Sequence, residues 1–151
     1  MHRAVAVAKR GHWPSSQAAA AVTLDYDARY RRRISLDCGS FGRVLLDLPE
    51  ASVLAEGDGL KLKDGGWIHV HAALEDLLEI SSVDSFSLVR IAWHLGNHHC
   101  PTDLSASRLR IRRDHVMESL LRGLGCSPIP VRAVFNPEKG AYHEAGQGHG
   151  E

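Results

Sequence analysis

The spacing of apolar and polar residues divides the chain into two halves of different character. From Val22 to about Ser81, short apolar runs alternate with glycine-containing turns such as Gly57-Asp58-Gly59. Short runs between tight turns are typical of β-strands in a small sandwich or barrel-like domain. The first half therefore predicts a β-rich domain with little helix.

Apolar residues follow a helical period in the second half. Asp84 or Ser85 is expected to cap a first helix. This helix is predicted to end near Leu95, because Gly96 and Asn97 tolerate left-handed geometry. Its apolar stripe is predicted to consist of Phe86, Leu88, Val89, Ala92 and Leu95.

A second helix is expected between an Asp114 cap and Gly125. Strands around the two helices are predicted at Leu78–Val83, Leu104, Leu109–Ile111 and Ile129–Phe135. Pro130 places the last strand at a sheet edge, because proline cannot donate a ladder hydrogen bond. The resulting order, β-α-β-β-α-β, is the ferredoxin-like or split βαβ arrangement.

The chain is therefore expected to be an α+β protein with a small all-β domain followed by a ferredoxin-like domain. The predicted parts are a flexible N-terminus at 1–20, the β-rich domain at 21–77, the ferredoxin-like domain at 78–135 and a disordered, histidine-containing tail at 136–151. The tail is glycine-rich and polar without apolar periodicity, which is the composition of a mobile segment.

Composition and charge exclude several classes of partner. The 151 residues contain 18 Lys and Arg against 18 Asp and Glu, so no net positive field attracts nucleic acid. The longest apolar runs, such as Ala18–Val22, are too short to span a membrane. Cys38, Cys100 and Cys126 are an odd set without close pairing, and no secretion signal is evident. A cytoplasmic chain with reduced thiols is expected.

Histidines are the most distinctive residues: there are ten, and six lie at or after His94. Four of them surround the two predicted helices: His94, His98, His99 and His115. Imidazole suits nickel, copper and zinc better than calcium or magnesium. His94 and His115 also fit capping or surface roles at helix ends, whereas the sharp loop beside His98 favours His99 as a ligand.

Two further histidines, His69 and His71, share one face of a predicted strand and could chelate a metal weakly. A solvated face of a half-buried strand is the simpler account of this pair. His94 and His98 have the i, i+4 spacing, but Gly96-Asn97 is expected to interrupt the helix that a shared site would need.

Motifs of catalysis are missing from the sequence. It contains no His-Glu-x-x-His, no Cys-x-x-Cys and no glycine-rich phosphate loop followed by Lys. No catalytic residue is therefore predicted, and binding without turnover is favoured. Two alternatives stay open: a metal-dependent hydrolase using the same histidine cluster, with Asp114 or Glu118 as base, and an interaction module that binds no metal.

Several stretches resemble the urease accessory protein UreE family. The similar stretches are Trp93–Pro101, Leu109–Val116, Leu121–Gly125 and Phe135–Tyr142, together with Leu45–Pro49 and the Gly57-Asp58-Gly59 turn in the first half. The resemblance implies a nickel metallochaperone that delivers Ni²⁺ to the urease active site during urease maturation, and not an enzyme. It assigns partner or peptide binding to the β-rich domain, and metal binding and dimerisation to the second.

The resemblance also implies where the metal is held. Family members are homodimers with one nickel ion at the dyad, and the ligand histidine falls on His99. Tail histidines, here His143 and His149, can complete the coordination shell. The implied partners are the urease accessory GTPase and the urease apoprotein complex, and Zn²⁺ or Cu²⁺ can replace nickel in vitro.

Three features depart from the family pattern. His98 stands where the family usually has Arg, which makes it an additional or competing ligand. Cys100 stands where an apolar residue is common, and a thiolate there would favour copper or zinc. The tail holds only two histidines, so one ion per dimer is expected rather than storage of several.

Overall fold

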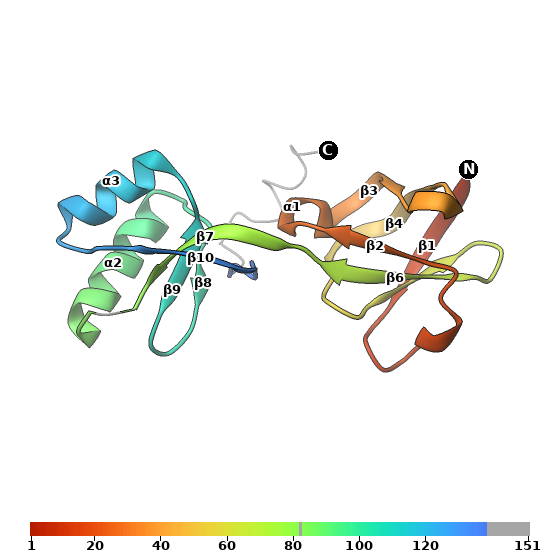
Figure 1. Ribbon diagram of the computed structural model, residues 1–151, viewed down its shortest axis with the longest axis horizontal. Coiled ribbons are helices and arrows are strands. Elements are labelled where there is room, and N and C mark those ends of the chain that lie inside the picture. Colours follow the sequence, from red (N-terminus) through yellow and green to blue (C-terminus); the bar gives the residue numbers. More distant parts are fainter. Residues whose placement is uncertain (82, 139–151) are drawn as a thin grey trace. The chain divides into compact units, whose positions relative to one another are not determined.

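The computed structural model describes residues 1–81 and 83–138. Contacts within the chain divide it into an N-terminal unit, Met1–Ala73, and a C-terminal unit that starts at Leu74 (Figure 1). The boundary precedes the one expected at Leu77, because the strand that opens the second unit, β7, already begins at Leu74.

The N-terminal unit is built on a six-stranded sheet. Its strands are β1 (His2–Ala8), β2 (Ala20–Leu24), β3 (Tyr30–Asp37), β4 (Arg43–Val53), β5 (Gly59–Leu62) and β6 (Trp67–Ala72), in the order β2-β6-β5-β1-β4-β3. The β1–β4 and β2–β6 pairs are parallel, and the other neighbours are antiparallel. Three single-turn helices connect them: η1 (Ser15–Gln17), α1 (Tyr26–Arg29) and η2 (Gly39–Phe41).

The expected flexible N-terminus at 1–20 is wrong for most of its length. Strand β1 lies inside the sheet, where Ala4 pairs with Leu46 of β4 on one side and Leu62 of β5 on the other. Ala4 is fully buried among the core residues. The stretch is short and rich in alanine, so its apolar signal is weak, and its backbone hydrogen bonds to two neighbours decide its place.

Alternating residues of the sheet form the core of the N-terminal unit. Val44, Leu46 and Leu48 of β4 all point into it, as the period of two requires. Pro49 does not end this strand as prolines often do. The β3–β4 pairing shifts register between Arg31 and Arg33, so Pro49 lies in the irregular part, where no ladder donor is needed.

The C-terminal unit has the predicted β-α-β-β-α-β order. Its elements are β7 (Leu74–Ile80), α2 (Ser85–Asn97), β8 (Asp103–Leu104), β9 (Leu109–Arg112), α3 (His115–Gly123) and β10 (Ile129–Val134). The antiparallel sheet has the order β10-β7-β9-β8, which is the ferredoxin-like order. The predicted α+β fold class is therefore confirmed, and β10 with Pro130 lies at the sheet edge as expected.

Both helices pack on this sheet through a shared core (Figure 1). The core residues include Leu78, Ile80, Leu109 and Ile111 from the strands and Ile91, Leu95 and Leu121 from the helices. The predicted apolar stripe of α2 is only partly right, because Phe86 and Val89 point away from the core. The apolar arc of α2 is wide, and periodicity alone cannot say which part of it meets the sheet.

The segment after β10 is tied to the C-terminal unit before the described residues end. The backbone amide of Asn136 donates to Asp103 Oδ2 at 3.1 Å, and that of Glu138 donates to the Thr102 carbonyl at 2.8 Å. The rest of the expected tail, with His143 and His149, lies outside the described residues. Within the described part of the chain, no helix is long and apolar enough to cross a membrane.

Candidate metal centre

The C-terminal end of α2 carries the histidines of the predicted site. The helix does not end near Leu95 but continues through Gly96 to Asn97, because the hydrogen-bonded turns hold the glycine in helical geometry. The amide of His98 donates to the His94 carbonyl at 3.1 Å. The expected interruption between these two histidines is therefore absent.

The left-handed residue at this helix end is His99, with a φ of 55°. Among residues 1–81 and 83–138, it is the only residue other than glycine with a positive φ. The His99 amide donates to the Gly96 carbonyl at 3.0 Å, and the Cys100 amide donates to the Leu95 carbonyl at 2.9 Å. These two bonds define a Schellman motif, whose left-handed position is usually glycine.

A histidine at this position costs stability. Left-handed geometry brings Cβ close to the following carbonyl oxygen and costs about 1 kcal/mol for an ordinary L-residue, although histidine is enriched among the exceptions. Backbone strain of this kind is concentrated at functional sites. His98 and His99 are both exposed, so the turn presents two accessible imidazoles at the end of α2.

Cys100, which follows them, is partly buried. Burial raises the pKa of its thiol, and the nearby carboxylate of Asp114 raises it further. Its Sγ lies 3.7 Å from the Pro101 carbonyl oxygen. A bound metal ion itself promotes deprotonation of a thiol, so the thiolate ligand expected at this position stays a prediction.

The other two predicted histidines lie at opposite helix ends. His94 is half-buried in the last turn of α2, with its ring edge-on to Trp93 at 5.1 Å between centroids. His115 is the exposed first residue of α3, next to the N-cap Asp114. Neither position contradicts the capping or surface roles considered from the sequence.

Within residues 1–81 and 83–138, His94, His98, His99 and His115 do not come together in a metal site. Within the described residues, one group of at least three metal-ligating side chains has its ligand atoms within 4.8 Å of one another. This group lies in the N-terminal unit and consists of Glu56, His69 and His71. The sequence showed the His69–His71 pair but had no local signal for Glu56, which precedes another strand.

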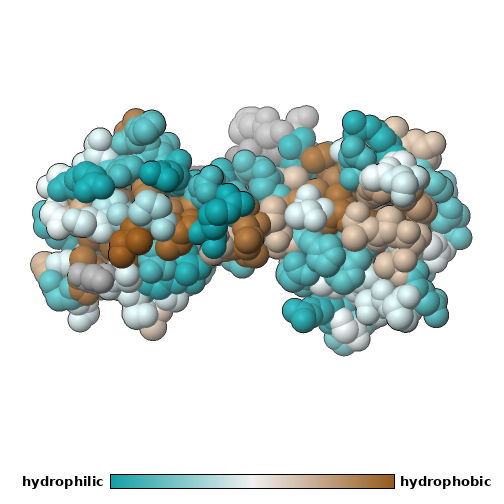
Figure 2. Space-filling view, viewed as in Figure 1, coloured by the Kyte–Doolittle hydropathy of each residue, from teal (hydrophilic) through white to brown (hydrophobic). Residues whose placement is uncertain are grey.

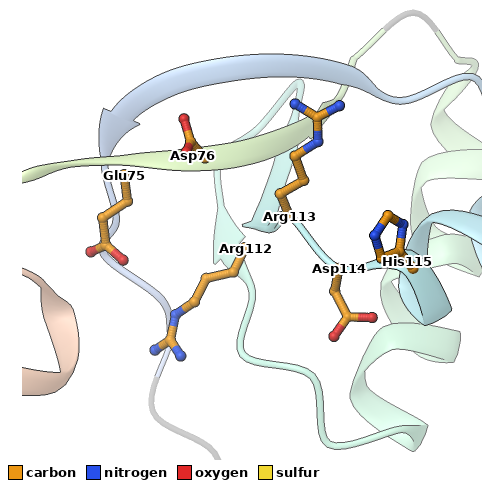
Figure 3. A pocket seen from close by; sticks show the side chains of 6 residues that line it. All are labelled: Glu75, Asp76, Arg112, Arg113, Asp114 and His115. Carbon is orange, nitrogen blue, oxygen red and sulfur yellow. The ribbon is translucent and has the colours of Figure 1, made fainter.

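A shallow hollow of about 420 Å³ lies beside the start of α3. Its lining residues are Glu75, Asp76, Arg112, Arg113, Asp114 and His115 (Figure 3). Several of these charges already serve the fold: Asp76 pairs with Arg132 at 2.9 Å, and the Arg112 guanidinium lies 5.2 Å from the ring centroid of Phe135. The hollow is open and of mixed charge, unlike an enclosed catalytic pocket.

The outward face of α2 is apolar and has no partner within the described residues. Phe86, Val89 and Trp93 are 76%, 68% and 64% exposed. Their i, i+3, i+7 spacing places them on one stripe, here called the α2 stripe, which runs toward the helix end that carries His98 and His99. Hydrophobic residues, brown in Figure 2, lie at several places on the surface of this unit. Exposed apolar patches mark interaction surfaces.

Family models match both units of the chain. The model described as "UreE urease accessory protein, N-terminal domain" matches residues 2–73, and that described as "UreE urease accessory protein, C-terminal domain" matches residues 75–151. The chain belongs to the UreE family of urease accessory proteins.

Curated UreE relatives are similar over most of their length. "Urease accessory protein UreE" of Bradyrhizobium sp. (strain ORS 278) is 49% identical over 150 residues, which cover 99% of this chain and 71% of the relative. Its counterpart from Beijerinckia indica is 46% identical over 149 residues, covering 99% and 86%. That from Rhodobacter capsulatus is 44% identical over 142 residues, covering 94% and 87%.

Membership of the UreE family decides between the classes of function considered from the sequence. UreE proteins are accessory proteins of urease maturation and not enzymes, so the prediction of a non-enzymatic chaperone is confirmed. The hydrolase alternative for the histidine cluster is set aside on the same ground.

Proposed function

We propose that this chain binds Ni²⁺ as a cytoplasmic homodimer and delivers it to the urease active site during urease maturation. The ion is held at the dyad by His99 from each copy. The observation that carries this proposal is an exposed imidazole, in a left-handed turn at the end of an exposed apolar stripe, in a chain of the UreE family.

A two-fold axis can provide a second ligand that the described part of one chain does not place beside His99. A lone exposed imidazole binds a divalent ion weakly, and the described part of one chain assembles no group of three ligands around His99. A two-fold axis through the site doubles the imidazoles without any further sequence. Such an open, incomplete shell releases its ion readily, as a delivery protein requires and a closed structural site does not.

The α2 stripe supports dimerisation through the C-terminal unit. Phe86, Val89 and Trp93 are large apolar side chains on one face of α2. A symmetric contact that covers this face buries the stripe and brings the ends of α2, with their His99 residues, toward the same axis. One surface then serves both dimerisation and metal binding.

The remaining predicted ligands are assigned supporting roles. His98 is an additional or competing ligand beside His99, and His94 and His115 are candidates from the same unit. His143 and His149 reach the ion from the tail. The chain is proposed to act with the urease accessory GTPase and the urease apoprotein complex, and Zn²⁺ or Cu²⁺ replaces nickel in vitro.

Nickel titration calorimetry with the His99→Ala variant tests the proposal. Loss of the dyad ion is expected, together with loss of any nickel-dependent increase in dimer measured by light scattering. The matched control is His12→Ala, an exposed histidine of the N-terminal unit that lies outside the predicted site. Retention of the dyad ion in His99→Ala, or an ion bound by a chain that stays monomeric, contradicts the proposal.

A further inference from the structure

The N-terminal unit carries a group of ligands that the family assignment does not use. His69 and His71 lie two residues apart on β6, so their side chains share one face of the strand. Their rings stack with centroids 4.3 Å apart. Glu56 approaches from the turn before β5, with Oε2 at 3.0 Å from His71 Nδ1 and 3.9 Å from His69 Nε2.

The carboxylate of Glu56 is oriented by the backbone around it. Its Oε1 accepts a hydrogen bond of 2.9 Å from the Ala72 amide, which leaves Oε2 toward the imidazoles. Burial works against ionisation, but the hydrogen bonds from Ala72 and His71 and the charge of the imidazoles bring the pKa of Glu56 below its usual value. The side chain is thus presented as a carboxylate.

The turn that carries Glu56 is itself pinned to the sheet. The Gly57 amide donates to the Val70 carbonyl at 2.9 Å. Buried Asp58 accepts hydrogen bonds from the amides of Ala55, at 2.9 Å, and Arg10, at 3.1 Å. The turn that carries Glu56 is therefore held in place by bonds that do not depend on an ion, which reduces the cost of ordering this ligand.

His69 supplies the strongest indication of a missing ligand. Its Nε2 is buried and has no hydrogen-bond partner among the described residues, although Glu56 Oε2 lies 3.9 Å away. The ring is fixed edge-on against Trp13 at 5.5 Å, and Trp13 Nε1 donates to the Gly57 carbonyl at 3.0 Å. A buried nitrogen without a hydrogen-bond partner destabilises the folded state, and a bound ion would remove this penalty.

We propose that Glu56, His69 and His71 form a second metal site, one per chain, for a divalent transition ion of the nickel, copper and zinc group. Two imidazoles and one carboxylate are a known donor set for such ions and leave a coordination position open. In a tetrahedral site with metal–ligand bonds of 2.0–2.1 Å, two ligand atoms lie about 3.3 Å apart. Glu56 Oε2 lies 3.0 Å from His71 Nδ1 and 3.9 Å from His69 Nε2, one value below and one above that distance.

The site lies wholly within the N-terminal unit and needs no second copy of the chain. It is therefore independent of the dyad ion, and it rests on the proposed function only for the expectation that nickel is among the ions carried. With one ion shared at the dyad and one per chain, a dimer takes up one plus two, or three, ions. His99→Ala removes the first of these, and Glu56→Gln removes the other two.

Tryptophan fluorescence provides a local readout for this site. Trp13 contacts His69 and stacks on Trp67 at 5.4 Å. In the full chain with Trp93→Phe, all remaining indole emission comes from the N-terminal unit. Paramagnetic Cu²⁺ or Ni²⁺ bound at His69 quenches this emission, and Zn²⁺, which does not quench, competes for the site.

Titrations of the Trp93→Phe chain with Cu²⁺, Ni²⁺ and Zn²⁺ test the proposal. Saturable quenching at one ion per chain is expected, and Glu56→Gln and His71→Gln should each weaken it by at least about tenfold. Glu50→Gln and His12→Gln are matched controls, exposed residues of the same unit that should leave the titration unchanged. Because His69 packs on Trp13, the two partly exposed ligands carry the test, and thermal denaturation confirms that each variant is folded.

Each outcome separates this site from the dyad site. Quenching that persists in His99→Ala supports the second site, even if the dyad proposal fails. Absence of saturable quenching by Cu²⁺ and Ni²⁺, or equal quenching in Glu56→Gln and in Glu50→Gln, overturns the second site and leaves Glu56 and His71 as an ion pair only.

Discussion

Helices α2 and α3 of the C-terminal unit share their capping chemistry and differ on their exposed sides. Each starts at an aspartate N-cap, Asp84 or Asp114, and each ends in a Schellman motif. The left-handed residue of that motif is Gly125 in α3, with a φ of 82°, and His99 in α2, with a φ of 55°. The outward side of α2 bears the α2 stripe, whereas exposed residues of α3 such as Ser119 are mostly polar.

The difference separates residues that serve folding from residues for which we propose a role in binding. Glycine adopts left-handed geometry without a steric penalty, so Gly125 suits the fold alone. His99 makes a single chain less stable than a glycine at this position would, and the α2 stripe leaves large apolar side chains exposed. His99 lies at the C-terminal end of α2, and the α2 stripe lies along its outward side. The proposed nickel site and the proposed dimer contact therefore meet on this helix.

The largest expected effect comes from replacing His99 by glycine, the residue type that takes the left-handed position after α3. In His99→Gly, the nickel affinity of the dyad should fall at least about a hundredfold. The free energy of unfolding without metal should rise by up to about 1 kcal/mol, because glycine accepts the left-handed turn. Nickel calorimetry and urea denaturation measure the two quantities. A variant that keeps its nickel affinity contradicts the role of His99 as a ligand. A variant that is less stable than the parent contradicts the stability cost assigned to its left-handed backbone.

A glutamate introduced on the outward side of α2 should weaken the dimer, whereas one introduced on the outward side of α3 should not. Trp93→Glu places a carboxylate in the α2 stripe and should raise the dimer dissociation constant by about thirtyfold, or 2 kcal/mol. Ser119→Glu adds the same charge to the exposed side of α3 and should leave the dimer intact. Sedimentation or light scattering over a dilution series compares them. An equal response of the two variants would remove the α2 stripe from the dimer contact.

Replacing Gly96 and Gly125 by alanine should change the free energy of unfolding in opposite directions. A Cβ would meet no atom within 4 Å at either Gly96 or Gly125, so only backbone conformation distinguishes them. Gly125→Ala should reduce the free energy of unfolding by about 1 kcal/mol, because of its positive φ. Gly96→Ala, inside α2, should raise it by up to about 1 kcal/mol. Urea denaturation gives both values, and effects of the same sign would exclude the conformational explanation.

The smallest expected effect concerns the N-cap of α2 at acid pH. Hydrogen bonds from the Ser87 amide, at 2.8 Å, and hydroxyl, at 2.9 Å, hold the pKa of Asp84 below its ordinary value of 3.8. A lowered folded-state pKa means that this stabilisation is complete above the unfolded-state pKa and is lost as the pH falls through the folded-state pKa.

Asp84→Asn keeps a capping oxygen that does not titrate. The variant should therefore show a slightly flatter decline of the melting temperature in acid than the parent, with little change near neutral pH. Thermal denaturation over a pH series measures this, and identical acid declines would show that the Asp84 carboxylate does not contribute.

Much of the C-terminal unit was predictable because its signals are local. Asp114 followed by apolar residues at helical spacing, and Gly125 after them, placed α3 well. Pro130 correctly marked an edge strand. The predicted end of α2 near Leu95 is wrong, because Gly96 and Asn97 can occupy either a helix or a left-handed turn. Hydrogen bonds beyond them place the left-handed residue at His99.

Contacts between segments that are distant in the sequence explain the features that local patterns did not predict. Strand β1 carries a weak apolar signal, yet it is paired on both sides within the sheet. Glu56 reaches His69 and His71 only because β5 and β6 pair and the turn before β5 folds back on β6. The outward orientation of Phe86 likewise depends on which part of the α2 arc packs on the sheet.

The order of strands and helices in the C-terminal unit and its aspartate caps followed from the order of residues alone, because each depends on neighbours a few positions apart. The tertiary structure decided that His99 takes the left-handed place, that the α2 stripe stays uncovered in one chain, and that a glutamate joins two stacked imidazoles. Those outcomes depend on sheet pairing and on which helix face is buried, and both are set by the packing of the whole unit.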